Sequence, residues 1–271
     1  MSRFDKLYQK KNSGILNIYI TIGFPSMAAT REIILSLADS GVDIIELGIP
    51  YSDPLADGPI IQQASSVAIK NGFNLKDMFI LIKEVREHTQ IPIVLMGYLN
   101  PILQYGMDAF LQSCQDVGVD ALIIPDLPPE IYALSFQQLF RERGIGIAFL
   151  ITPNTSEERI YKMDELSDSF IYMVSSSAIT GGKLSIDQQK EAYFKRIVSM
   201  SLLTPRLIGF GIHDQRTVQQ AFTYANGAII GSAFIQHIEN KSHQSIPERV
   251  QQFIEQIGEG QRVGGRVETS R

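Results

Sequence analysis

Two carboxylates eleven positions apart are the strongest indication of chemistry in this chain. Glu46 lies inside an apolar segment, residues 42–48, with the composition of a buried strand, and Asp57 lies in the proline-rich loop that follows. A buried carboxylate is costly unless it is paired, protonated or used, so we interpret Glu46 as a candidate catalytic group, with a structural salt bridge as the alternative. Asp57 is a second candidate, but the sequence Asp-Gly-Pro is as typical of a turn or a helix N-cap as of a catalytic loop.

The residue types that support metal, thiol or Schiff-base chemistry are not arranged for it. The single cysteine, Cys114, excludes an internal disulfide and a multi-cysteine metal site, and we interpret it as a helix-packing residue. His, Cys and carboxylates do not cluster at metal-ligand spacing, and no lysine ends a predicted strand. We therefore expect acid–base chemistry with no metal and no cofactor in this chain.

Charge and hydropathy limit the expected partners. The formal net charge is −5 and the basic residues form no stripe, so nucleic acid is not an expected partner. No apolar run reaches the roughly 18 residues that a membrane helix needs. The N-terminus carries charges of both signs with no apolar stretch behind it, which predicts a cytoplasmic protein without a signal peptide.

Short β-branched segments alternate with longer amphipathic ones along the chain. The short segments predict eight strands, at residues 18–21, 44–47, 93–96, 121–124, 145–150, 170–174, 207–210 and 228–230. The longer segments predict helices, among them residues 28–40, 75–88, 108–117, 130–143 and 156–166. Gly41, Gly118 and Gly144 directly follow three of these helices, where a left-handed glycine typically ends a helix.

This alternation predicts an α/β protein with a parallel sheet, and eight units in about 250 residues fit a closed (β/α)8 TIM barrel. Extra helices are expected before the barrel, over about residues 3–11, and after it, over residues 247–257. No Gly-x-Gly-x-x-Gly follows the first strand, which argues against a dinucleotide site. We expect residues 1–258 to form one barrel domain and residues 259–271 to be a disordered tail.

In such a barrel the active site lies at the carboxyl ends of the strands. Gly-Phe-Gly, residues 209–211, follows the seventh strand, and Gly231-Ser232 opens a helix after the eighth. These glycine-rich loops predict a phosphate site, with a simple helix N-cap as the alternative. The small, polar segment 175–185 predicts either a lid or a plain long loop. His213 adjoins the phosphate loops, and we assign it no role.

Several motifs in order point to one known family. The most specific is Glu46-Leu-Gly-Ile-Pro-Tyr-Ser-Asp-Pro-Leu-Ala-Asp-Gly-Pro59, and the others are residues 19–25, 100–106, 125–128, 179–181, 209–211 and 231–232. Together they resemble the tryptophan synthase α subunit, from about residue 15 to about residue 257.

The resemblance implies a lyase that cleaves indole-3-glycerol phosphate to indole and glyceraldehyde 3-phosphate by a retro-aldol reaction. It also implies an αββα complex, in which indole passes to a β subunit that binds pyridoxal phosphate. By matching position, Glu46 would protonate indole C3 and take a hydroxyl proton, while Asp57 would stabilise charge developing at the indole N–H. A desolvated Glu with a raised pKa beside an ionised Asp is consistent with these roles.

The same resemblance assigns the other site residues. The phosphate would be bound by Phe210, Gly211, Gly231 and Ser232, with Gly181 from the lid. The indole pocket would be lined by Tyr19, Leu95 and Tyr172. Thr180 matches a lid threonine that contacts Asp57. Ala178 departs from the family, which usually has Gly there, and alanine would be strained if that position needs a positive φ.

Two other functions stay open at this stage. One is an α-like regulatory subunit of weak turnover that activates a β subunit, and the other is a barrel isomerase of a similar phosphorylated substrate. The isomerase would also use two carboxylates and a phosphate site, but it does not predict the loop over residues 53–59.

Overall fold

The computed structural model describes residues 1–175, 186–239 and 244–258. Within these ranges eight parallel strands close into one barrel in sequence order, with β1 paired to both β2 and β8. The strands are β1 (Ile15–Thr21), β2 (Ile44–Gly48), β3 (Ile93–Met96), β4 (Ala121–Ile123), β5 (Gly146–Ile151), β6 (Ile171–Val174), β7 (Arg206–Gly209) and β8 (Gly227–Ile230). The predicted (β/α)8 barrel and its eight strands are confirmed.

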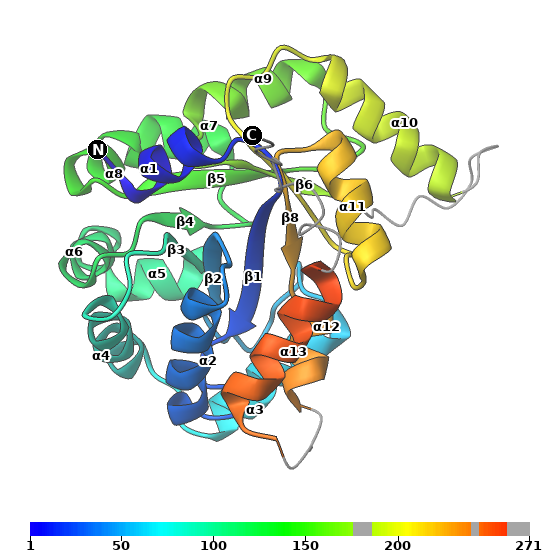
Figure 1. The fold of residues 1–271 in the computed structure, drawn as a ribbon. Coiled ribbons are helices and arrows are strands. Elements are labelled where there is room, and N and C mark those ends of the chain that lie inside the picture. Colours follow the sequence, from blue (N-terminus) through cyan, green and yellow to red (C-terminus); the bar gives the residue numbers. More distant parts are fainter. Residues whose placement is uncertain (176–185, 240–243, 259–271) are drawn as a thin grey trace, which may run out of the picture.

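Helices surround the barrel (Figure 1). In the described ranges they are α1 (Arg3–Lys10), α2 (Met27–Asp39), α3 (Pro59–Lys70), α4 (Leu75–Arg86), α5 (Leu99–Tyr105), α6 (Met107–Val117), α7 (Pro129–Ile131), η1 (Tyr132–Phe136), α8 (Gln137–Arg143), α9 (Glu157–Leu166), α10 (Ile186–Ser199), α11 (Gln215–Tyr224), α12 (Ser232–Glu239) and α13 (Ile246–Gly258). The two predicted terminal helices correspond to α1 and α13. Gly118 and Gly144 end α6 and α8 in the left-handed conformation, as expected.

The segment predicted as one helix over residues 130–143 is helical throughout, but it contains the π-helical turn η1 between α7 and α8. Tyr132, at the start of η1, is fully buried and packs edge-on against Phe140 and Phe149, with ring centroids 5.1 and 5.4 Å away. A single π turn widens the helix by one residue and leaves most of the amphipathic pattern intact. The sequence periodicity therefore does not reveal it.

The barrel wall is packed on both faces, because side chains alternate along each strand. One apolar cluster lies between the strands and the helices and includes Leu47. A second cluster fills the inside of the barrel and includes Val94 and Leu207. Phe4 of α1 joins the inner cluster, 6.2 Å from the ring of Phe170, which directly precedes β6. α1 thus covers the amino ends of the strands and leaves the carboxyl ends for the site.

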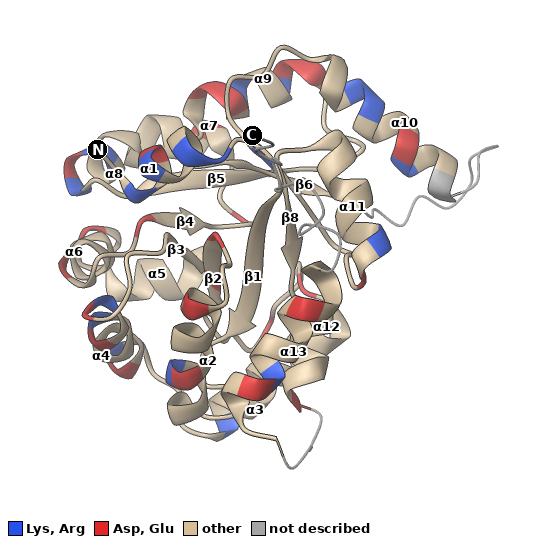
Figure 2. Cartoon of the chain, viewed as in Figure 1, with Lys and Arg blue, Asp and Glu red and all other residues tan. Residues whose placement is uncertain are grey.

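The outer helices carry charges of both signs, interspersed along α4, α8 and α10 (Figure 2). None of the helices in the described ranges is long and apolar enough to cross a membrane.

Candidate active site

Glu46 occupies the middle of β2 and points into the barrel. Its register partners are Tyr19 on β1 and Val94 on β3, both of which belong to the inner cluster. Only 1% of Glu46 is exposed. The Nδ2 group of Asn17, on β1, donates a hydrogen bond to Glu46 Oε2 at 2.8 Å. Glu46 Oε1 has no hydrogen-bond partner within the part of the chain that the structure describes.

The surroundings of Glu46 favour its protonated form. Burial raises the pKa of Glu46 to about 8, the hydrogen bond from Asn17 opposes this shift, and the charge of Asp57 adds to it. Among the described residues, no Lys or Arg forms an ion pair with Glu46. The structural salt bridge considered from the sequence therefore has no support in these ranges. A carboxyl that titrates near neutrality can both give and take a proton.

Asp57 lies in the loop that joins β2 to α3. Tyr98 Oη, directly before α5, donates a hydrogen bond to Asp57 Oδ2 at 3.3 Å and accepts one from the N–H of Ala56 at 2.9 Å. Tyr98 thereby fixes this loop near the carboxyl end of β3. Burial raises the pKa of Asp57 to about 6, and the Tyr98 hydrogen bond opposes the shift. Gly58 is the N-cap of α3, so the N-cap alternative for Asp57 is wrong.

Tyr19 and Tyr172 line the inside of the barrel close to both carboxylates. Each is buried, and burial together with the negative charges of Glu46 and Asp57 raises the pKa of both phenols well above the ordinary value. Their hydroxyl groups fill space that two glycines leave open. A Cβ atom at Gly48 would overlap the Tyr19 hydroxyl, and one at Gly209 would overlap that of Tyr172.

Leu95 lies on the other face of the barrel wall. It pairs in register with Leu47 of β2 and packs in the outer cluster, beneath the helices. Its neighbours Val94 and Met96 belong to the inner cluster, because successive side chains point to opposite faces. The assignment of Leu95 to the indole pocket is therefore corrected. Met96, at the carboxyl end of β3, is the inward-facing residue next to it.

The loops after β7 and β8 present backbone to the barrel mouth. Phe210 has a φ of 67°, the one positive value at a non-glycine position in the described ranges, and Gly211 follows at 76°. The Phe210 ring packs edge-on against Tyr172, with centroids 6.1 Å apart. α12 begins at Ser232, directly after Gly231. The first N–H groups of a helix have no intrahelical partner, so this arrangement suits an anion.

The remaining predicted residues are placed as follows. Ala178, Thr180 and Gly181 lie outside the described residues, together with the rest of segment 176–185. His213 Nδ1 lies 2.9 Å from the carbonyl oxygen of Gly211, and its side chain is largely exposed.

Sequence reasoning missed Asn17 and Tyr98, which contact the two carboxylates. For Asn17 a signal was present, since an amide two positions before Tyr19 in an apolar strand shares the face of that tyrosine.

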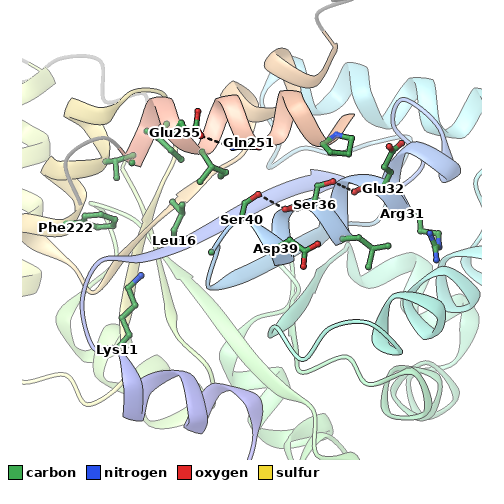
Figure 3. A pocket seen from close by; sticks show the side chains of 17 residues that line it. Lys11, Leu16, Arg31, Glu32, Ser36, Asp39, Ser40, Phe222, Gln251 and Glu255 are labelled. Atoms are coloured by element: carbon green, nitrogen blue, oxygen red, sulfur yellow. Dashed lines mark hydrogen bonds between the residues drawn. The ribbon is translucent and has the colours of Figure 1, made fainter. Parts of the chain in front are cut away.

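A separate hollow of about 1070 Å³ lies at the amino end of β1, between α2, α11 and α13 (Figure 3). Leu16, Ser40, Phe222 and Glu255 are among its lining residues, and none of the predicted site residues is. In this fold, features at the amino ends of the strands serve stability rather than chemistry. Within the described ranges, no group of three or more His, Cys, Asp or Glu is arranged to hold a metal ion.

Comparison with known proteins agrees with this geometry. Residues 4–262 match the family model described as Tryptophan synthase alpha chain. A protein of that name from Christiangramia forsetii is 48% identical over 246 residues, which cover 91% of this chain and 96% of the relative. The crystal structure of Tryptophan synthase alpha chain from Legionella pneumophila subsp. pneumophila has a TM-score of 0.85 at 30% identity, over 98% of this chain and 100% of that one. A chain in the tryptophan synthase complex from Pyrococcus furiosus has a TM-score of 0.80 at 35% identity, over 91% of this chain and 98% of that one.

Proposed function

The chain belongs to the tryptophan synthase alpha chain family, and from this membership we propose that it cleaves indole-3-glycerol phosphate into indole and glyceraldehyde 3-phosphate in L-tryptophan biosynthesis. The observation that carries the mechanism is the state of Glu46. It is buried inside the barrel and forms no ion pair with a Lys or Arg among the described residues, and this burial raises its pKa to about 8. A carboxyl in this state supplies acid–base catalysis with side-chain chemistry alone.

Glu46 acts twice in the proposed reaction. In its protonated form it gives its proton to C3 of the indole ring, which leaves the ring positively charged. The resulting carboxylate takes the proton of the hydroxyl group on the adjacent carbon of the glycerol chain. The bond between C3 and that carbon then breaks, its electron pair returns to the ring, and the carbon becomes the aldehyde of glyceraldehyde 3-phosphate. One proton leaves Glu46 and one returns, so the residue ends in its starting state.

Asp57 acts in its ionised form in this proposal. Protonation of C3 places positive charge on the indole N–H, and a carboxylate beside it offsets that charge. The pKa of about 6 for Asp57 and about 8 for Glu46 support the division of roles, because between these values one group is charged and the other is neutral. The hydrogen bond from Tyr98 holds the Asp57 carboxylate in place.

The substrate would lie across the barrel mouth. Tyr19 and Tyr172, with Met96 in place of Leu95, would line the indole pocket. The phosphate would accept hydrogen bonds from N–H groups of four residues in the loops after β7 and β8, namely Phe210, Gly211, Gly231 and Ser232. Gly181 at the phosphate and Thr180 in the lid are further proposed contacts from the segment outside the described residues.

The proposed partner is a β subunit, in an αββα assembly, that binds pyridoxal phosphate and receives the indole. A structural relative of this chain occurs in what is called a tryptophan synthase complex. Leu55, in the loop between the two carboxylates, is 95% exposed, and Tyr98 joins this loop to the start of α5, near Asn100 and Pro101. A partner that contacts either place would act on Asp57. We place this one-domain barrel, residues 1–258, in the cytoplasm with the biosynthetic pathway.

Release of indole from indole-3-glycerol phosphate, by the chain alone and with a β subunit added, tests the function. Turnover by the isolated chain that increases with the β subunit supports the lyase. If the chain activates the β subunit but releases no indole, either alone or with the β subunit added, it is a regulatory subunit and the proposal is refuted.

A further inference from the structure

Asn17 is a polar side chain in an apolar place. It lies on β1 with zero exposure, between register partners Ile44 on β2 and Ile229 on β8. Both partners belong to the apolar cluster inside the barrel. A buried amide is unfavourable there unless hydrogen bonds replace those it would make with water.

The hydrogen bonding of Asn17 is incomplete. Its Nδ2 group donates to Glu46 Oε2 at 2.8 Å, while its Oδ1 atom has no partner in the described part of the chain. Leaving a buried acceptor unsatisfied costs stability, so an apolar residue of similar size would suit the barrel core better. Among the described residues, the side-chain interaction that favours an asparagine here is the hydrogen bond that it donates to Glu46.

The two oxygens of Glu46 differ in the same way. Oε2 accepts the Asn17 hydrogen bond, and Oε1 is without a partner among the described residues. In a neutral carboxyl, the oxygen that accepts an N–H hydrogen bond keeps its carbonyl character, and the proton resides on the other oxygen. We propose that Asn17 is a positioning residue, whose hydrogen bond to Oε2 places the proton of Glu46 on Oε1 and makes Oε1 the oxygen that exchanges protons with substrate.

This inference rests on the proposed function. Other titratable groups lie around Glu46. Asp57 faces it from the loop after β2, Tyr19 from β1 and Tyr172 from β6. The charge of Asp57 raises the pKa of Glu46, whereas the Asn17 hydrogen bond lowers it by stabilising the carboxylate. Loss of the Asn17 donor should therefore move the pKa of Glu46 upward and free its carboxyl plane to rotate.

The test compares Asn17→Leu, which keeps the approximate size and removes the amide, with Ile44→Leu, which alters the same layer of the barrel and keeps the amide. Infrared difference spectra against Glu46→Gln isolate the carbonyl band of neutral Glu46. We expect this band to move to higher frequency in Asn17→Leu, because its carbonyl loses a hydrogen bond, and to stay in place in Ile44→Leu.

Kinetics of indole-3-glycerol phosphate cleavage give the second measurement. For Asn17→Leu we expect kcat to fall by about tenfold or more with KM little changed, since misorientation of a catalytic group affects the chemical step. The decline of activity at high pH should also move to higher pH. Asn17→Leu should lose some thermal stability, because Glu46 Oε2 is left buried without its donor, so thermal unfolding serves only to check that both variants fold.

An unmoved carbonyl band together with an unmoved pH profile would overturn the inference. A band that shifts in a chain without any lyase activity would overturn the proposed function instead, because the spectrum does not depend on turnover. A shifted band in an active chain whose kcat is unchanged by Asn17→Leu would refute the role of Oε1 in proton exchange.

Discussion

Glu46→Gln should change how the stability of the protein depends on pH. Burial raises the pKa of Glu46 from 4.5 to about 8 in the folded chain. A group whose folded pKa is raised gives its full contribution to stability below the unfolded pKa and loses it as pH rises through the folded pKa. The wild-type chain should therefore lose stability between about pH 4.5 and about pH 8 through this one carboxyl.

The size of the effect follows from the shift. Across this window the unfolded carboxyl is ionised and the folded one stays largely protonated, so folding takes up a proton at about 1.4 kcal/mol per pH unit. Between about pH 5 and about pH 7 the loss is then roughly 2 to 3 kcal/mol. The introduced glutamine does not titrate, so the stability of the variant relative to wild type should rise by that amount over this interval.

Urea unfolding at a series of pH values measures this difference directly, provided that both proteins unfold in two states. The comparison is between the slopes of unfolding free energy against pH. New contacts of the introduced amide shift the whole curve of the variant by a constant and do not change its slope. Glu87→Gln, which changes an exposed carboxyl at the end of α4, is the matched control and should run parallel to wild type. Parallel curves for Glu46→Gln and wild type would refute the claim that Glu46 is buried and protonated.

The other predictions concern the loop, the phosphate and the partner. Tyr98→Phe removes the donor that lowers the pKa of Asp57, so the loss of activity on acidification, centred near pH 6, should move to higher pH in a pH–rate profile. Tyr51→Phe, whose ring lies 5.1 Å from that of Tyr98, should not move it. Gly231→Asp should abolish binding of glycerol phosphate in a titration while the fold stays intact. Unchanged affinity would contradict the proposed position of the phosphate site. Coupling between the site and the β subunit must be reciprocal, so glycerol phosphate should increase the affinity of the chain for the β subunit. Pro54→Gly should reduce this coupling more than it reduces the activity of the isolated chain. An affinity for the β subunit that is the same with and without glycerol phosphate in wild type would contradict the coupling.

The barrel could be predicted from the sequence because its local signals agree with one another. Each strand is a short β-branched segment, and glycines such as Gly118 and Gly144 mark where helices end. The position of Glu46 inside such a segment was enough to single it out. These features depend on residues that are close together in the chain. Periodicity is informative over such short sequence separations.

The features that the sequence did not reveal depend on register between strands. Residues 93–96 are apolar at every position, so alternation cannot tell which face of β3 is inside, and Leu95 was assigned in place of its inward neighbour Met96. The hydrogen bond from Asn17 to Glu46 joins residues 29 positions apart and follows from the pairing of β1 with β2. The lid segment around Thr180 lies outside the described residues, so its role stays a prediction.

The most direct test of the central claim is the turnover of indole-3-glycerol phosphate by Glu46→Gln, with ligand binding measured separately. The proposed mechanism predicts a fall in kcat by a factor of about 10² to 10⁴, the usual contribution of general acid–base catalysis. The affinity for glycerol phosphate should be unchanged, because the loops after β7 and β8 are intact. A variant that binds normally and keeps more than about a tenth of the wild-type turnover would contradict the assignment of Glu46 as the proton-transfer group.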